Sequence, residues 1–429
     1  MATLHILEAR FGRVRIEGER LARLSPERLE KMLAAIQTPG DLVRTPALDR
    51  ALLLIGDLPG VVVRGQFEPG AREGETDIVL KTTNSPLLSG KVLADNAGGR
   101  SIGAVRQYIS LELASPLGLG DKGSLALLHS RGSDYVRADY SVPVGYTGLQ
   151  VGLAASQLRY RLVSPELQAL NASGNSRSVE LQANYPLLRS QITNLYTGLT
   201  LANKHYFNEA SGFSSSDYPV RSASLALWGN RLDSLWGGGY NTGSLTWTQG
   251  HLNLNGSPSR DADAAGPQVA GSFGVARIQA SRQQTLMPGT NLNLRYSGQW
   301  ANKNLDSSEK FYLGGASGVR AYPQGEASGS MGQLINVDLQ TYLGNNLRLS
   351  AFIDWGQVTI NHTTFDTSLN RHDLSGYGLA LDVFGMRSVQ MQVVWARRLG
   401  SNPSPLANGN DLDGSLQKNR FWLNISSIF

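Results

Sequence analysis

The sequence predicts an all-β transmembrane barrel of about sixteen antiparallel strands, preceded by a small α+β domain. The chain has 429 residues, of which 48 are glycine, and only 17% are charged, against roughly 25% in soluble domains. From residue 87 onward, short stretches alternate apolar and polar residues and are separated by turn residues. A barrel with an apolar exterior and a polar interior accounts for both observations.

Residues 1–82 have a different pattern, in which helical periods occur between strands. Ser25 is a predicted helix N-cap and Pro26 suits the first helical position. Apolar residues then recur at helical spacing. The predicted elements are a strand at 12–18, a helix at 25–36, a helix from residue 45, and strands at 61–67 and 76–82. This β-α-α-β-β order predicts a small sheet covered on one face by two helices.

The remainder of the chain contains no helical period. In 179–185 and 335–339, apolar residues alternate with large polar ones, and the chain ends in RFWLNISSIF, which has the same alternation. A soluble sandwich could also alternate. Tyrosine and tryptophan near predicted strand ends favour a membrane barrel instead, because aromatic girdles lie at its two interfaces. Strands in a bilayer must pair completely, so the predicted sheet closes on itself.

One segment, residues 308–333, is too long for a periplasmic turn and is placed among the extracellular loops. It contains FYLGGASGVRAYPQGEASGSMG, with Arg320 at its centre. One interpretation is a flexible surface loop with a solvated arginine. The other starts from Asp354, whose neighbours Ile353 and Trp355 would face lipid, so that the carboxylate faces the lumen. If the loop folds inward, the two charges can form a bidentate pair.

The run LIGDLPGVVVRGQFEPGAREGETDIVL resembles a POTRA domain, in particular its Leu58–Val61 turn, Pro69-Gly70 and Gly74. The resemblance implies three parts. Residues 1–11 would be the remnant of a preceding POTRA domain, 12–82 a POTRA domain and 87–429 the barrel. By the same resemblance, an exposed strand edge would bind a partner chain by β-augmentation; its residues are Val61, Val63, Gly65 and Phe67.

The long loop resembles the signature motif of the Omp85 superfamily, and FIDWG at 352–356 resembles the partner motif on its barrel wall. VRAYPQGEASG is similar to the two-partner secretion (TpsB) branch. Ala321 stands where the superfamily most often has glycine, which disfavours the insertase branch. The resemblance implies a loop–wall lock between Arg320 and Asp354. The other motif residues are Gly314, Gly315, Val319, Ala321, Tyr322 and Pro323 on the loop and Phe352 and Gly356 on the wall.

The resemblance implies a pore in the Gram-negative outer membrane, with the POTRA domain in the periplasm. It would recognise and secrete a large unfolded exoprotein of the TpsA type, a toxin or an adhesin, without nucleotide hydrolysis. We expect a monomer in contact with outer-membrane lipids. The alternatives are an Omp85-type insertase, which would need several POTRA domains and a weak seam, and a passive porin, which would need no POTRA domain.

Other function classes have little support. The histidines show no HExxH spacing, cysteine is absent, and no GxxxxGK[ST] or GxSxG motif occurs. We therefore expect no enzyme activity, no cofactor and no metal, and the scattered charge disfavours nucleic acid. The first residues lack an apolar signal region. Relatives of this type also carry an N-terminal plug helix and a first POTRA domain, so the chain is expected to be a processed or engineered piece.

Overall fold

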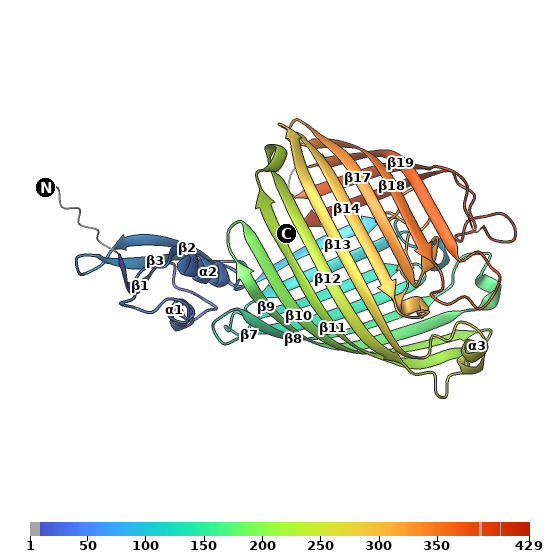
Figure 1. Ribbon diagram of the computed structural model, residues 1–429, viewed down its shortest axis with the longest axis horizontal. Helices are drawn as coiled ribbons and strands as arrows, with labels where there is room; N and C mark the ends of the chain where they lie inside the picture. The colour runs from blue at the N-terminus through green and yellow to red at the C-terminus, as the bar shows by residue number, and fades with distance from the viewer. Residues whose placement is uncertain (1–8, 386–387, 404) are drawn as a thin grey trace.

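The computed structural model describes residues 9–385, 388–403 and 405–429. A small domain lies at one end of a long barrel (Figure 1). On the side of the small domain the barrel strands are joined by short turns, and the long connections lie at the opposite end. Because outer-membrane barrels have short periplasmic turns and longer extracellular loops, the small domain lies on the periplasmic side. Among the described helices, none has both the length and the hydropathy to cross a bilayer.

The small domain has the expected β-α-α-β-β order. Its elements are β1 (Arg10–Gly18), α1 (Pro26–Ala34), α2 (Thr45–Gly56), β2 (Val61–Pro69) and β3 (Glu75–Asn84). The Ser25 hydroxyl accepts a hydrogen bond from the Arg28 amide at 3.3 Å and caps α1. The sheet order is β1-β3-β2, with β1 parallel and β2 antiparallel to the central β3. Strand β2 therefore lies at an edge of this sheet.

The core of the small domain corrects one expected boundary. Leu29, Leu33, Leu48 and Ile55 from the helices are fully buried against the sheet, together with Phe11. Arg10 and Phe11 belong to β1, so they are part of this domain and not of a preceding one. The strand begins two residues before Gly12, its register shifts between Phe11 and Val14, and the buried Phe11 ring fills the core. The rest of the expected remnant, residues 1–8, lies outside the described residues.

The second unit is a closed barrel, and within the described residues it has sixteen antiparallel strands, which confirms the predicted fold class. The strands are β4 (Leu88–Asp95), β5 (Arg106–Ala114), β6 (Lys122–Ser130), β7 (Ser133–Val144), β8 (Leu149–Arg161), β9 (Ser173–Arg189), β10 (Thr193–Ala210), β11 (Phe213–Asp233), β12 (Gly239–Leu252), β13 (Gly271–Met287), β14 (Thr290–Ala301), β17 (Met331–Leu343), β18 (Leu347–Thr359), β19 (Arg371–Phe384), β20 (Val389–Arg398) and β21 (Asn419–Ile428).

The two faces of the barrel wall differ as the alternation predicts. Leu225 and Trp247 are paired neighbours on β11 and β12, and both are exposed on the outer face. On the inner face, Arg137 of β7 donates to Glu180 of β9 at 3.0 Å. The barrel closes where β21 pairs with β4, from Asn424 opposite Asp95 to Ile428 opposite Lys91. This closing seam is shorter than the β20–β21 pairing beside it.

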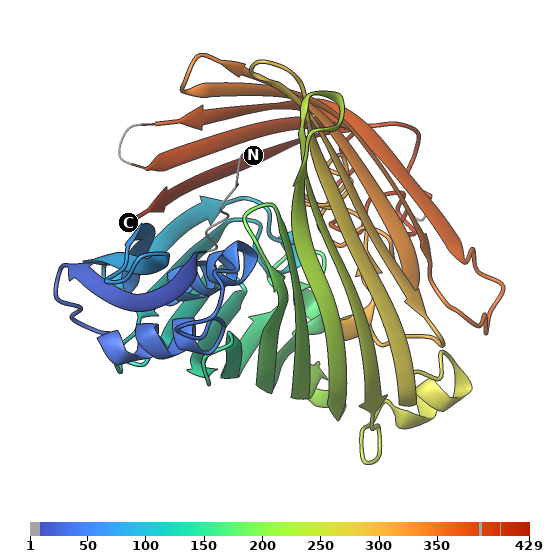
Figure 2. The ribbon, with the colours of Figure 1, turned by 60° about the vertical axis from the view of Figure 1, so that its left-hand side comes forward.

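Polar contacts hold the small domain against the periplasmic turns. Asp57 accepts two hydrogen bonds from the Arg189 guanidinium, each 2.8 Å long. Arg50 donates to the Pro186 carbonyl at 2.7 Å. A cavity of about 240 Å³ remains between the domain and the barrel. The open end of the barrel on this side therefore lies next to the small domain (Figure 2).

Candidate functional site

The connection between β14 and β17, residues 302–330, is the longest irregular segment within the barrel (Figure 2). The expected loop, 308–333, is therefore shifted. Residues 302–307 also belong to the loop, and residues 331–333 already pair with β18. Strand pairing begins at Met331, opposite Thr359, although the glycine-rich sequence at 331–333 predicts a loop. This segment is called the inward loop below.

The inward loop is held at its base by the wall formed by β10, β11 and β13. Glu309 is buried and accepts hydrogen bonds from Lys204 at 2.9 Å and from Arg277 at 2.9 Å. The Tyr218 hydroxyl donates to Asp306 at 3.1 Å. Since the tip of the loop contacts β17–β19, as described next, the loop extends from one wall of the lumen to another.

Glycines allow the tip of the loop to fold tightly. Short strands β15 (Phe311–Tyr312) and β16 (Ser328–Gly329) pair at its neck. Gly315 has a φ of +122°, which L-residues rarely adopt. A Cβ on Gly318 would lie 1.8 Å from the Leu313 carbonyl oxygen. The Val319 amide donates to that same carbonyl at 2.7 Å, so the chain folds back directly before Arg320.

The structure places Arg320 against Asp354 inside the barrel. The guanidinium donates Nε to Oδ2 at 2.9 Å and Nη2 to Oδ1 at 2.7 Å, and the Arg320 amide donates to Oδ2 at 3.0 Å. Asp354 is fully buried and Arg320 is 7% exposed. Removal of one partner of such a buried pair destabilises the fold by about 3–5 kcal/mol, because the other charge is left buried and unpaired. An exposed pair would contribute at most about 1 kcal/mol.

Two further residues of the site come from the neighbouring strand β17 and were not predicted as part of it. Asp338 accepts from the third guanidinium nitrogen, Nη1, at 2.7 Å. Asn336 donates to Asp354 at 2.7 Å and to the Gly318 carbonyl at 3.0 Å. The position of Asp338 next to Arg320 depends on the β17–β18 register, in which Asn336 lies opposite Asp354.

The wall motif supplies a close-fitting surface for the loop. The Arg320 guanidinium lies 3.4 Å from the centre of the Phe352 ring, in cation–π geometry. A Cβ on Gly356 would lie 2.6 Å from Leu313 of the loop. Ala321 is buried, and its Cβ would be 2.5 Å from a Cβ on Gly376 of β19. The absence of a side chain at residue 376 therefore leaves room for the alanine.

The remaining loop residues contact the end of β20 and the last extracellular connection, residues 399–418. Tyr322 is fully buried, and the Arg398 guanidinium lies 4.8 Å from its ring centre. Pro323 is also buried. Glu326 accepts from Asn402 at 2.7 Å and from the Leu412 amide at 2.8 Å. The inward loop thus supports a second loop at the outer mouth of the barrel.

The four residues expected at the partner-binding edge have different environments. Val61 is buried and Val63 is partly buried, both against the helices of the small domain. Gly65 lies beneath Leu52, because a Cβ there would be 2.6 Å from its methyl group. Phe67 is 50% exposed and is the accessible side chain of the set. In the described part of the chain, β2 pairs with β3 alone, so its other edge is unpaired.

Among the described residues, no group of three or more His, Cys, Asp or Glu side chains could hold a metal ion. The acidic residues of the site instead face arginines. Asp338 accepts from Arg295 at 3.0 Å as well as from Arg320. The site is therefore the Arg320 guanidinium held between the carboxylates of Asp338 and Asp354, an arrangement that fixes the position of the inward loop.

Comparison with known proteins places this geometry in a family. A family model described as "Haemolysin secretion/activation protein ShlB/FhaC/HecB" matches residues 74–383. The heme/hemopexin transporter protein HuxB of Haemophilus influenzae (strain 86-028NP) is 24% identical over 434 residues, which cover 99% of this chain and 74% of that protein. The outer membrane transporter CdiB of Dickeya dadantii is 24% identical over 380 residues, or 85% of this chain and 65% of CdiB.

Solved structures share the fold. CdiB from Escherichia coli superposes with a TM-score of 0.79 at 21% identity, covering 99% of this chain and 77% of that one. BamA from Haemophilus ducreyi lacking POTRA domains 1–3 gives a TM-score of 0.62 at 13% identity, covering 98% and 85%. The family match spans more than half of the chain. The chain therefore belongs to the haemolysin secretion/activation family ShlB/FhaC/HecB, within the Omp85 superfamily.

Proposed function

We propose that this chain, an outer-membrane transporter of the two-partner secretion type, moves an unfolded exoprotein through its lumen by displacing the inward loop. The observation that carries the proposal is the buried contact between Arg320 and Asp354. It holds a loop across the path that a translocating chain would take. Since the barrel closes within one chain, we propose that the transporter acts as a monomer in the lipid bilayer.

The partner is proposed to be a large secreted protein of the TpsA type. Family membership supports a secreted protein as the cargo. Among the relatives, HuxB is a heme/hemopexin transporter and CdiB an outer membrane transporter. A toxin, an adhesin or an iron-acquisition protein would all suit a polar lumen, because an extended chain can make many weak contacts with its lining. No nucleotide is required if folding outside the cell makes the movement directional.

The small domain is proposed to be a POTRA domain that captures the partner in the periplasm. Its unpaired β2 edge can accept an extended strand by β-augmentation, in which main-chain hydrogen bonds supply affinity. Phe67 lies on the helix-side face of this edge and is half exposed. It would contact an apolar side chain of the added strand. The domain lies beside the open end of the barrel, so a captured segment is close to the lumen (Figure 1).

Co-expression with a neighbouring gene for a large secreted protein tests the proposal. The measurement is the amount of partner in the culture medium, at matched barrel abundance. Phe67→Asp should reduce partner secretion, because a charge would replace the apolar contact. Val62→Asp is the matched control, since Val62 is 51% exposed but lies on the opposite face of β2. Equal secretion by both variants and the wild type would exclude a role for this face of β2 in binding the partner.

The insertase alternative finds one supporting observation, the short β21–β4 seam. It predicts that depletion of the protein reduces the assembly of other outer-membrane barrels. Family membership supports secretion instead, and we expect normal levels of other barrels after depletion. A passive porin would leave its lumen open, whereas here the inward loop crosses it.

A further inference from the structure

The outer face of the barrel carries a stripe of arginines on the extracellular side of its apolar band. On β9, the outward residues Leu181 and Val179 are followed toward the extracellular end by Arg177. On β11, Leu225 is followed in the same way by Arg221. Arg159 and Arg161 occupy the corresponding end of β8. All four arginines are exposed, and these four residues are called the outer arginine stripe below.

The outer arginine stripe differs from the arginines of the lumen. In the lumen, Arg137, Arg277 and Arg320 each form an ion pair with a carboxylate at 3.0 Å or less. In the part of the chain that the structure describes, no carboxylate lies within the 4.0 Å ion-pair distance of any guanidinium of the stripe. Positive charge beside the lipid band is therefore left without an internal counter-charge.

Three carboxylates toward the extracellular ends of β7, β10 and β11 already have other partners. These pairs are Asp134 with His129 at 2.6 Å, Asp217 with His205 at 2.9 Å, and Glu209 with the Ser173 hydroxyl at 2.8 Å. Asp134 lies directly opposite Arg159 in the β7–β8 register, yet its ion pair is with the histidine. The stripe is thus available to an external anion.

A hollow on the outer surface joins the stripe to the apolar band. It has a volume of about 800 Å³ and lies over β8–β13. Its apolar lining includes four large side chains on the lipid-facing side, Leu153, Val179, Leu181 and Leu201, and its polar lining includes Arg221 and His251. In the strand register, Arg221 lies between Asn203 and His251. One end of the hollow therefore suits an acyl chain and the other a charged headgroup.

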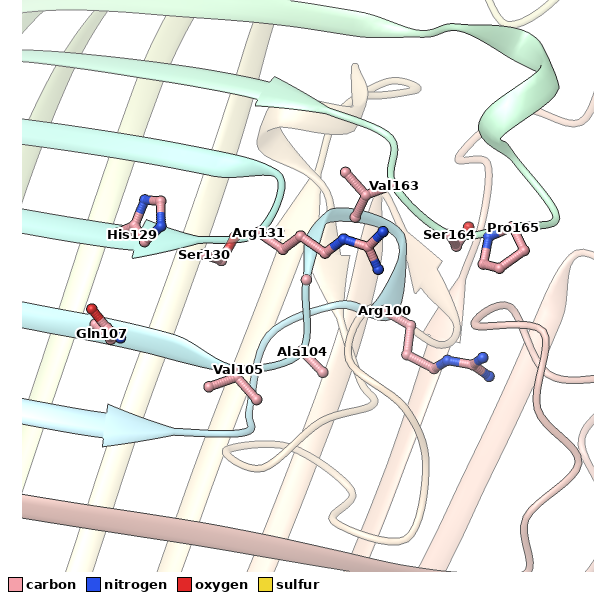
Figure 3. Close-up of a pocket in the computed structure, with 11 residues that line it drawn as sticks. Arg100, Ala104, Val105, Gln107, His129, Ser130, Arg131, Val163, Ser164 and Pro165 are labelled. Atoms are coloured by element: carbon pink, nitrogen blue, oxygen red, sulfur yellow. The ribbon is translucent and has the colours of Figure 1, made fainter.

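The positive charge continues around the barrel toward the seam. A second hollow, of about 430 Å³, lies at the extracellular ends of β5 and β6 and is lined by Arg100 and Arg131. Figure 3 shows both guanidinium groups pointing beyond the ends of the strands. Arg131 has no ion pair in the described residues, and Arg100 lies 3.9 Å from Glu166.

We propose that the outer arginine stripe binds the phosphate groups of a phosphorylated, multiply acylated glycolipid of the outer leaflet, with an acyl chain in the 800 Å³ hollow. Arginine suits phosphate because its planar fork can donate two parallel hydrogen bonds. Arg177 and Arg221 are two strands apart, on the order of 10 Å. A headgroup with more than one phosphate can therefore contact both.

The test is lipid binding to the purified chain in detergent micelles, measured by native mass spectrometry. The probes are diphosphoryl lipid A, its dephosphorylated form and inorganic phosphate. Each arginine near an anionic surface strengthens binding about fivefold. Arg177→Gln with Arg221→Gln should therefore weaken diphosphoryl lipid A binding on the order of twentyfold. Arg231→Gln is the matched control, because Arg231 is an exposed outward arginine at the periplasmic end of the same strand.

The wild-type chain alone also tests the proposal, without any variant that could misfold. It should bind diphosphoryl lipid A more tightly than the dephosphorylated lipid. Equal binding of these two lipids would overturn the proposal, as would an unchanged affinity in the double variant. Binding of inorganic phosphate as tightly as of the lipid would overturn the assignment to a lipid. None of these results depends on partner secretion, so the two proposals can fail separately.

Discussion

The indole nitrogen of Trp422 donates a hydrogen bond to the backbone carbonyl of Arg320 at 2.8 Å. Trp422 lies on β21, the strand that closes the barrel against β4, and its side chain is 8% exposed. At the same seam, the Asn96 side chain donates to the Phe421 carbonyl at 3.0 Å and accepts from the Leu423 amide at 2.8 Å. The inward loop and the closing seam are therefore connected by direct contact.

Replacement of Trp422 by Phe removes this hydrogen bond and keeps an aromatic ring. A buried carbonyl is left without its donor, so we expect the free energy of unfolding to fall by about 1–3 kcal/mol. Urea unfolding of the folded barrel in detergent measures this change. Trp236→Phe is the control, because Trp236 is 84% exposed in a periplasmic turn. An effect of equal size in both variants would contradict the assigned role of Trp422.

Asp354 and Asp338 should differ in their contribution to the loop–wall lock. Asp354 is fully buried and accepts from Arg320 and Asn336, so Asp354→Asn should destabilise the barrel by about 3–5 kcal/mol. Asp338→Asn should lower the stability less. Asp338 accepts a hydrogen bond from only one nitrogen of Arg320, and its other partner, Arg295, is half exposed. Unfolding midpoints and protease cleavage within 302–330 measure both. A larger effect at Asp338 would contradict this ranking.

The small domain should lose stability in acid through Asp77. The Arg13 amide donates to this buried carboxylate at 3.0 Å, and with the neighbouring arginines it lowers the pKa of Asp77. The folded pKa is below the unfolded value of about 3.9. Its contribution is therefore complete above about pH 4 and is lost as the pH falls toward the lowered pKa.

Thermal unfolding of the small domain over this pH range measures the effect of Asp77. Asp77→Asn should lower the stability at neutral pH and flatten its dependence on acid. Glu73→Gln is a suitable control, because Glu73 is exposed. If Asp77→Asn loses stability in acid as the wild type does, carboxylates other than Asp77 control the acid dependence of the small domain.

The contact between the small domain and the barrel should depend on Asp57 and Arg50. The double variant Asp57→Asn, Arg50→Gln weakens both polar contacts. It should broaden the distribution of distances between one spin label on the small domain and one on the barrel. The pair of Asp57 with Arg189 is partly exposed, so its contribution is about 1 kcal/mol or less and should weaken in high salt. Arg72→Gln, an exposed residue far from the barrel, is the control. An unchanged distribution would indicate that apolar contacts hold the domain.

Much of this architecture could be predicted from local pattern. The alternation of residues gave the strands and their outward faces, and the capping residue Ser25 marked the start of α1. The position of Asp354 in the lumen followed from Ile353 and Trp355 on the other face. These features depend on residues that are close in the sequence.

Features that depend on strand register could not be predicted in the same way. Asn336 and Gly376 reach the loop because β17 and β19 pair with β18 at particular residues. Trp422 reaches Arg320 only because the barrel closes. The sequence shows the residue types at 336, 376 and 422, but it does not show that all three contact the inward loop. The loop boundary was also shifted, since glycine-rich sequence continues into β17.

The central claim is that the loop–wall lock takes part in secretion, and Arg320→Ala tests it most directly. Partner protein in the medium and folded barrel in the membrane are measured in the same cells, with Arg231→Ala as the control. We expect secretion per folded barrel to fall at least tenfold in Arg320→Ala, which corresponds to about 1.4 kcal/mol, and to be unchanged in the control. Normal secretion at normal abundance of the Arg320→Ala barrel would contradict the claim.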